Sequence, residues 1–163
     1  MLRFYDKLSD LCFGELMCVY EEGNCEKAND QYAHMDKNAA LLQAEQDFYA
    51  YLEEIFFRTP NARYAVWEEG GRYISALRLE PFEDGLLLEA LETRPEYRNK
   101  GFAKKLILSV LPYIGVPLYS HVNKHNEPSL RTHASCGFVL VSENAKLIDG
   151  TRVDYCYTFV RKS

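Results

Sequence analysis

The stretch PEYRNKGFAKKLI, from Pro95 to Ile107, decides the fold. Four basic residues surround one glycine, Gly101, at the point where a helical pattern begins. From Ala103 onward the apolar residues recur every three or four positions, which is typical of a helix with one buried face. The first amides of a helix lack partners, and the helix dipole adds partial positive charge there. The stretch therefore predicts an anion site whose natural ligand is a phosphate or pyrophosphate.

Short strands are predicted on both sides of this helix. Before it, apolar runs and the turn signals Gly70-Gly71 and Asp84-Gly85 predict strands at Ala62–Trp67, Arg72–Leu79 and Leu86–Thr93. After it, the pattern predicts a strand at Pro117–Val122, a helix at Pro128–Ser135, and strands at Phe138–Val141 and Val153–Val160. This order predicts an α/β fold with a mixed, mostly antiparallel central sheet flanked by helices.

The N-terminal region has a helical period instead. One amphipathic helix is predicted from Leu8 to about Glu22, and a longer one from Leu41 to Phe56, before Pro60. The polar, Asn-rich segment Gly23–Asn38 is predicted to break them. With 163 residues, we expect one domain, in which residues 1–60 are helical and residues 62–160 form the sheet.

Composition narrows the class of protein. A net charge of -5 and a sequence pI near 5.4 argue against nonspecific nucleic-acid binding. The apolar runs are too short to cross a bilayer, and the acidic N-terminus does not suit a signal peptide. Five cysteines with no C-x-x-C pair favour reduced thiols over disulfides or a zinc knuckle. We expect a cytoplasmic protein that binds neither membranes nor nucleic acid.

The familiar nucleotide loops are missing, but another pattern is present. Neither G-x-G-x-x-G nor a P-loop occurs, whereas Arg98–Ala103 fits R/Q-x-x-G-x-G/A between a strand and a helix. With its flanks, LEALETRPEYRNKGFAKKLI resembles the pyrophosphate-loop block of the GNAT superfamily, the acetyl-CoA-dependent N-acyltransferases. NEPSLRTHASCGF, from Asn126, resembles the second block of that family. The resemblance covers roughly residues 62–160 and implies a single GNAT-like domain, with residues 1–60 on the acceptor side.

The resemblance implies acetyl transfer from acetyl-CoA to an amine, with no metal. We expect a primary amine on a small cationic molecule as the acceptor. The backbone amides from Lys100 to Ala103 would hold the pyrophosphate, with Ala103 in place of a second glycine. The residues expected to contact acetyl-CoA are Leu91, Glu92, Thr93, Arg98, Asn99, Lys100, Gly101, Phe102, Ala103, Lys104, Asn126 and Ser129.

Glu89 is the first candidate for the acceptor side. A lysine-like amine has a pKa of about 10.4, so it must lose a proton before it can attack. Glu89 stands where relatives carry a glutamate that binds the ammonium or accepts its proton, although pairing with Arg78 is the alternative. The resemblance also implies an oxyanion site in backbone amides near Leu91–Thr93.

The residue that protonates the leaving thiolate departs from the family pattern. The family has a tyrosine seven residues after Asn126, where this chain has His133. Histidine can donate a proton, and a thiolate needs only modest help, so we expect retuned chemistry. His133 packing on its own helix is the alternative, and Tyr119, Tyr155 or Tyr157 could supply a hydroxyl.

Other interpretations remain open. His121 and His125 are four residues apart but lack a third ligand at standard spacing, so no metal site is predicted. Because His133 stands in place of the family's tyrosine, the alternative function is a CoA-binding sensor that has lost catalysis. A protein or peptide N-acetyltransferase is the third possibility, and a homodimer is possible.

Overall fold

The computed structural model describes residues 1–162. A seven-stranded sheet has the order β1-β2-β3-β4-β5-β9-β6, and β7 and β8 form a separate pair. The strands are β1 (Leu2–Tyr5), β2 (Arg63–Glu69), β3 (Arg72–Phe82), β4 (Gly85–Thr93), β5 (Leu118–Asn123), β6 (Val139–Ser142), β7 (Ala145–Lys146), β8 (Arg152–Val153) and β9 (Cys156–Arg161). The α-helices are α1 (Phe13–Val19), α2 (Glu21–Gln31), α3 (Lys37–Glu54), α4 (Phe102–Val110) and α5 (Glu127–Ser135). Short 3₁₀ turns lie at Leu8–Asp10, Phe56–Arg58, Pro95–Tyr97 and Leu111–Tyr113.

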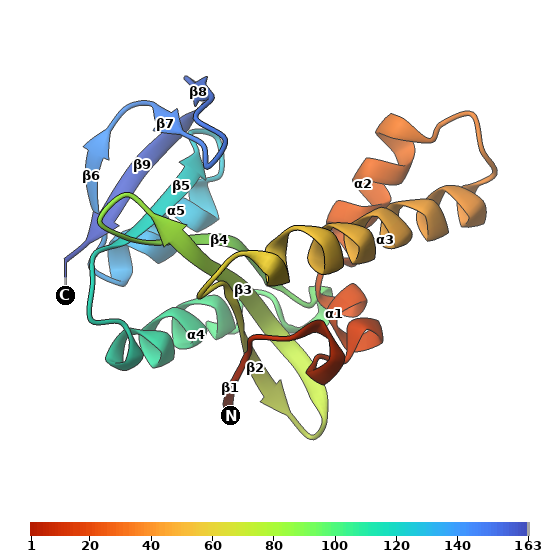
Figure 1. Cartoon of the computed structure of the whole chain (residues 1–163), viewed down its shortest axis with the longest axis horizontal. Helices are drawn as coiled ribbons and strands as arrows, with labels where there is room; N and C mark the ends of the chain where they lie inside the picture. The colour runs from red at the N-terminus through yellow and green to blue at the C-terminus, as the bar shows by residue number, and fades with distance from the viewer. Residues whose placement is uncertain (163) are drawn as a thin grey trace.

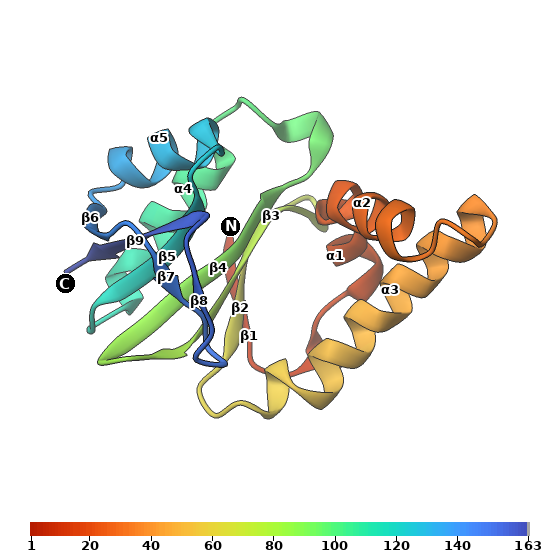
Figure 2. The same cartoon turned by 90° about the horizontal axis from the view of Figure 1, so that it is seen from above.

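Helices cover both faces of the sheet. Figure 2 shows α4 and α5 on one face and α1, α2 and α3 on the other. The pair α2–α3 extends beyond the sheet as an arm (Figure 1). Each neighbouring pair in the large sheet is antiparallel except β4 with β5, which is parallel. The predicted α/β class with a mixed, mostly antiparallel sheet is therefore confirmed.

Each face of the sheet has its own apolar core. On the α4 face, Leu106, Ile107 and Val110 are fully buried against Leu77 and Leu88. On the other face, the core contains the following buried aromatic and aliphatic side chains: Leu16, Leu52, Phe56, Tyr64 and Tyr73. The helical period of α4 and the alternation along the strands thus direct the apolar side chains toward the sheet.

The predicted break at Gly23–Asn38 is wrong over most of its length. Residues Glu21–Gln31 form α2, which packs along α3. Asp36 caps α3, because its side chain accepts hydrogen bonds from the amides of Asn38 and Ala39. The sequence does not predict α2 because its composition is polar, and the helix buries only Asn24 and Ala28. A helix with so narrow an apolar stripe lacks the period that marks an amphipathic helix.

The N-terminus also departs from the helical prediction for residues 1–60. Leu2–Tyr5 form β1, which pairs antiparallel with β2 from Leu2 opposite Trp67 to Tyr5 opposite Tyr64. The first predicted helix is divided into the 3₁₀ turn at Leu8–Asp10 and α1. Four residues are too few to establish a period of two in the sequence. Pairing with β2 therefore determines that Leu2–Tyr5 form a strand.

Candidate active site

The sheet opens between its two parallel strands. β4 and β5 pair only from Leu86 opposite Leu118 to Leu88 opposite Ser120. Past this point β4 bends at Ala90, whose φ of 49° is unusual for a residue with a side chain. The pairing of β4 with β3 also shifts register there, and the Tyr20 hydroxyl donates to the Ala90 carbonyl at 2.6 Å. The bulge therefore directs the end of β4 away from β5.

The predicted anion loop lies directly after β4. Gly101 is the N-cap of α4 with φ of 80°, in the left-handed region, and Asn99 has φ of 59°. No side chain caps this helix, and the first backbone bond runs from Lys105 to the Gly101 carbonyl at 2.9 Å. The amides before Lys105 thus face outward without helical partners. A β-carbon built on Gly101 meets no other atom within 4 Å, so the approach to these amides is open.

A cavity of about 440 Å³ lies in front of these amides. It is lined by Leu91, Glu92, Thr93, Arg98, Asn99, Gly101, Phe102, Ala103, Lys104, Asn126 and Ser129, and by Glu22, Tyr97, Pro128 and Thr132. The structure therefore brings together all of the predicted acetyl-CoA contacts except Lys100. The Lys100 ammonium donates to the Glu96 carbonyl at 2.9 Å and lies over the Tyr97 ring. The free amides and basic side chains of this cavity fit a pyrophosphate.

Arg98 is already engaged by acidic side chains. Its Nε donates to the Thr93 carbonyl at 3.1 Å, and its guanidinium pairs with Glu22 of α2 and, at 3.8 Å, with Glu92. Burial raises the pKa of Glu92, while Arg98 opposes that rise. Glu22 comes from the start of α2, a helix that is for the most part not predicted from the sequence, so one carboxylate from the arm reaches the anion site.

A second, smaller cavity of about 170 Å³ lies in the gap between β4 and β5. Leu91, Asn126 and Ser129 line both cavities, so the two share a wall. Asn126 caps α5, because its side chain accepts from the Ser129 amide at 3.1 Å. A ligand arm that passes along the start of α5 would therefore lead from the first cavity into the gap between the strands.

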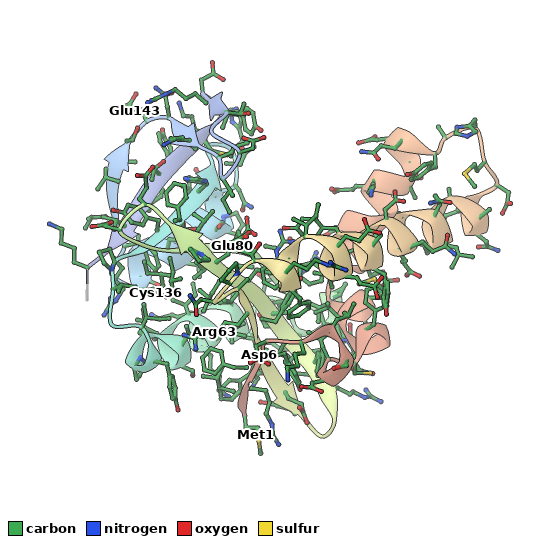
Figure 3. The ribbon with its side chains drawn as sticks, in the orientation of Figure 1. Met1, Asp6, Arg63, Glu80, Cys136 and Glu143 are labelled. Atoms are coloured by element: carbon green, nitrogen blue, oxygen red, sulfur yellow. The ribbon has the colours of Figure 1, made fainter. Side chains whose placement is uncertain are left out.

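Glu89 lines the smaller cavity and lies in an ion pair. Its Oε1 is 3.2 Å from Nε of Arg78, its partner across the β3–β4 ladder, without hydrogen-bond geometry between the two atoms. Arg78 also lies over the rings of Tyr51 and Phe56. Glu80 is 5% exposed on the same face of β3, and burial together with the neighbouring Glu89 carboxylate raises the pKa of Glu80 to about 8. Figure 3 labels Glu80 where the sheet faces α3.

His133 is buried against the other face of the sheet. Its Nδ1 is 2.8 Å from the Ser129 carbonyl, which can only accept, so Nδ1 carries the proton. Its Nε2 lies 2.9 Å from Oγ of Ser120 and accepts from that hydroxyl. The ring is 2% exposed and packs on Phe138, and burial lowers the pKa of His133. His133 therefore lines the smaller cavity as a neutral, hydrogen-bonded side chain.

Comparison with known families identifies the chain. The family model described as the acetyltransferase (GNAT) family matches residues 26–138. This chain belongs to the GNAT acetyltransferase family. It is therefore an acetyltransferase, and acetyl-CoA is its acyl donor. A comparison with curated protein sequences found no significant match.

Solved structures share the fold of this acetyltransferase. The PaiA N-acetyltransferase of Thermoplasma acidophilum, in complex with coenzyme A, is 14% identical with a TM-score of 0.61, covering 100% of this chain and 99% of that chain. An aminoglycoside 6'-acetyltransferase type Ii is 10% identical with a TM-score of 0.64, covering 99% and 96%. Campylobacter jejuni PseH, in complex with acetyl coenzyme A, is 12% identical with a TM-score of 0.60, covering 100% and 99%.

Sequence reasoning does not mark three of the residues that line the two cavities. Glu22, Ser120 and His121 line the cavities, but no local pattern marks them. In the sequence, the spacing of His121 and His125 raises only the question of a metal ligand. Within residues 1–162, no group of three or more His, Cys, Asp and Glu side chains is placed to hold a metal ion. In the same part of the chain, no helix is long and apolar enough to cross a membrane.

Proposed function

We propose that this GNAT enzyme transfers the acetyl group of acetyl-CoA to the primary amine of a small cationic molecule. One observation carries the proposal. The cavity at the start of α4 shares a wall with the gap between β4 and β5, and Glu89 lines that gap. An anionic donor and a cationic acceptor would therefore meet at the opening of the sheet.

The first cavity would hold the coenzyme. The amides of Phe102, Ala103 and Lys104 would bind the pyrophosphate, and the Lys104 ammonium and the Arg98 guanidinium add charge. The pantetheine arm would pass Asn126 and Ser129, which line both cavities. Bound there, acetyl-CoA supplies a thioester, and the chain's own groups must orient it and exclude water.

The acceptor ammonium would bind beside Glu89. With Arg78 positive, Glu89 negative and Glu80 holding a proton below about pH 8, the cluster is close to neutral at physiological pH. An arriving ammonium would favour release of the Glu80 proton, because a second carboxylate then faces two positive charges. Glu89 would thus bind the ammonium, and Glu80 would adjust the charge of the site.

Backbone amides past the end of the β4–β5 pairing would meet the oxyanion. β4 has no strand partner on that side beyond Leu88, and Leu91 lines both cavities. His133 lies behind this point and would deliver a proton to the thiolate only through a neighbouring hydroxyl, of Ser129 or Ser120. A thiol pKa of about 8.5 makes the leaving group tolerant of a weak acid, so we expect His133→Phe to slow transfer without abolishing it.

The function is tested by offering the enzyme many amines. The purified protein is mixed with acetyl-CoA and, in separate reactions, with polyamines, aminoglycosides, amino acids and peptides, and free thiol is followed. We expect release with a small cationic amine and little with peptides. Glu89→Gln should raise KM for that amine, whereas Glu127→Gln should not, because Glu127 is exposed and pairs with Arg131 alone in the described residues 1–162. Binding of coenzyme A without thiol release from any amine would refute the proposal.

A further inference from the structure

His121 is the one group of the smaller cavity whose buried nitrogen has no hydrogen-bond partner in residues 1–162. The pairing of β4 and β5 ends at Leu88 and Ser120, so Glu89 and His121 are the next residues on the two strands. Corresponding residues of parallel strands point to the same face. His121 and Glu89 therefore line the gap side by side, and Nε2 of His121 is buried there without a partner.

The groups around His121 keep it neutral but close to negative charge. On β9 its neighbour is Thr158, which is uncharged, and its ring packs edge-on against Phe82 at 5.3 Å. Burial lowers the pKa of His121, and the charge of Glu89 opposes that change. A neutral imidazole has a free lone pair at one nitrogen, which is what a proton acceptor needs.

Charged groups from the other elements face the same region. From β3 come Arg78, which pairs with Glu89, and Glu80. From α3, Tyr51 lies under the Arg78 guanidinium. On the same strand as His121, Tyr119 donates to Asp84 at 2.6 Å and is thereby occupied. Glu89 supplies charge beside Arg78, and the buried nitrogen without a partner at the gap belongs to His121.

We propose that Nε2 of His121 is the general base that takes the proton from the acceptor amine. The inference rests on the proposed function and names a residue for its proton transfer. Glu89 binds the ammonium by charge, and His121 receives a proton from it at the place where the thioester would lie.

The proton balance has two parts. An ammonium that becomes an amide loses two protons from nitrogen. His121 takes the first, which frees the lone pair, and the new N–C bond then forms while the C–S bond breaks. His121 passes its proton to solvent, and the second proton ends on the leaving thiolate, so coenzyme A leaves as a thiol. No oxidant, reductant or further reactant is required.

The test compares two neighbouring histidines. His121→Gln keeps a polar side chain without a base, and His125→Gln is the control, because His125 is exposed in the following loop. General bases contribute about a hundredfold or more, so we expect kcat/KM for the amine to fall by that factor in His121→Gln alone. Because burial lowers the pKa of His121, wild-type activity should fall only at a pH below the ordinary histidine value of about 6.5, and the variant should lose this acid limb.

Two further measurements distinguish a role of His121 in proton transfer from a structural role. Calorimetry should give the same Kd for coenzyme A in wild type and His121→Gln. Added imidazole should restore activity to His121→Ala, because the truncated side chain leaves room for a free base. A His121→Gln enzyme within threefold of wild type, with its acid limb intact, would overturn the assignment and leave the proposed function standing. A wild-type protein that binds coenzyme A but acetylates no amine would overturn the proposed function itself.

Discussion

Gly101→Ala tests whether the amides at the start of α4 hold the pyrophosphate. The φ of 80° places this residue in the left-handed region, where a β-carbon costs about 1–2 kcal/mol. The new methyl meets no protein atom within 4 Å, so backbone strain is its whole effect on the fold. For a chain of this length, each kcal/mol lowers Tm by about 2–4 °C. The methyl also stands at the wall of the 440 Å³ cavity, where it obstructs the approach to the amides.

The expected loss of affinity follows from the hydrogen bonds concerned. A hydrogen bond to a charged group contributes about 1.5–3 kcal/mol, so the loss of one weakens coenzyme A binding about ten- to hundredfold. Gly71→Ala is the matched control, because Gly71 has φ of 79°, is equally open and lies in the β2–β3 turn. Urea unfolding and calorimetry should show equal losses of stability in the two variants and a loss of affinity only in Gly101→Ala. Equal affinities for coenzyme A in both variants would refute the reasoning.

Three other variants test the surroundings of the site and the core. Glu22→Gln removes one of the two carboxylates that pair with Arg98 and should tighten coenzyme A binding about two- to fivefold by calorimetry, less at high salt. Glu80 has a pKa of about 8 in the folded protein against 4.5 ordinarily. The protonated Glu80 therefore contributes its full stabilisation below about pH 4.5 and loses it as the pH rises through 8. In urea unfolding measured against pH, Glu80→Gln should flatten this decline in the unfolding free energy. Leu106→Ala should lower the unfolding free energy by about 2–5 kcal/mol in the same assay, because Leu106 is fully buried.

The sequence predicted the fold well where local signals agree. α4 has a strong apolar period after a glycine, and β3 and β4 are separated by a clear turn signal, so both were found. α2 and β1 are not predicted, each for its own reason. α2 has a polar surface with almost no apolar stripe, and β1 is four residues long. β1 depends on β2, a partner distant in sequence that no local window contains, and α2 depends on packing against the next helix, α3.

The site also contains residues that the sequence predicts and residues that it does not. The predicted coenzyme contacts near Gly101 came from one continuous stretch, and the structure places them around one cavity apart from Lys100. Glu22 and His121 reach the cavities from α2 and β5, and their positions follow from packing. The charge state of Glu80 is likewise a property of burial beside Glu89. A sequence supplies residue types, whereas a shifted pKa requires neighbours in space.

The opening of the sheet links the fold to the chemistry. β4 and β5 form the only parallel pair within the large sheet of residues 1–162, and a parallel pair is joined through a helix, here α4. The start of that helix must therefore lie beside the end of β4, which places the free amides next to the strand that carries Glu89. Because Ala90 bends β4 away from β5, the backbones of the two strands no longer pair with each other past Leu88 and Ser120. The open edge of β4 and the gap that Glu89 and His121 line thus have one physical origin: strands held together at one end and separated at the other.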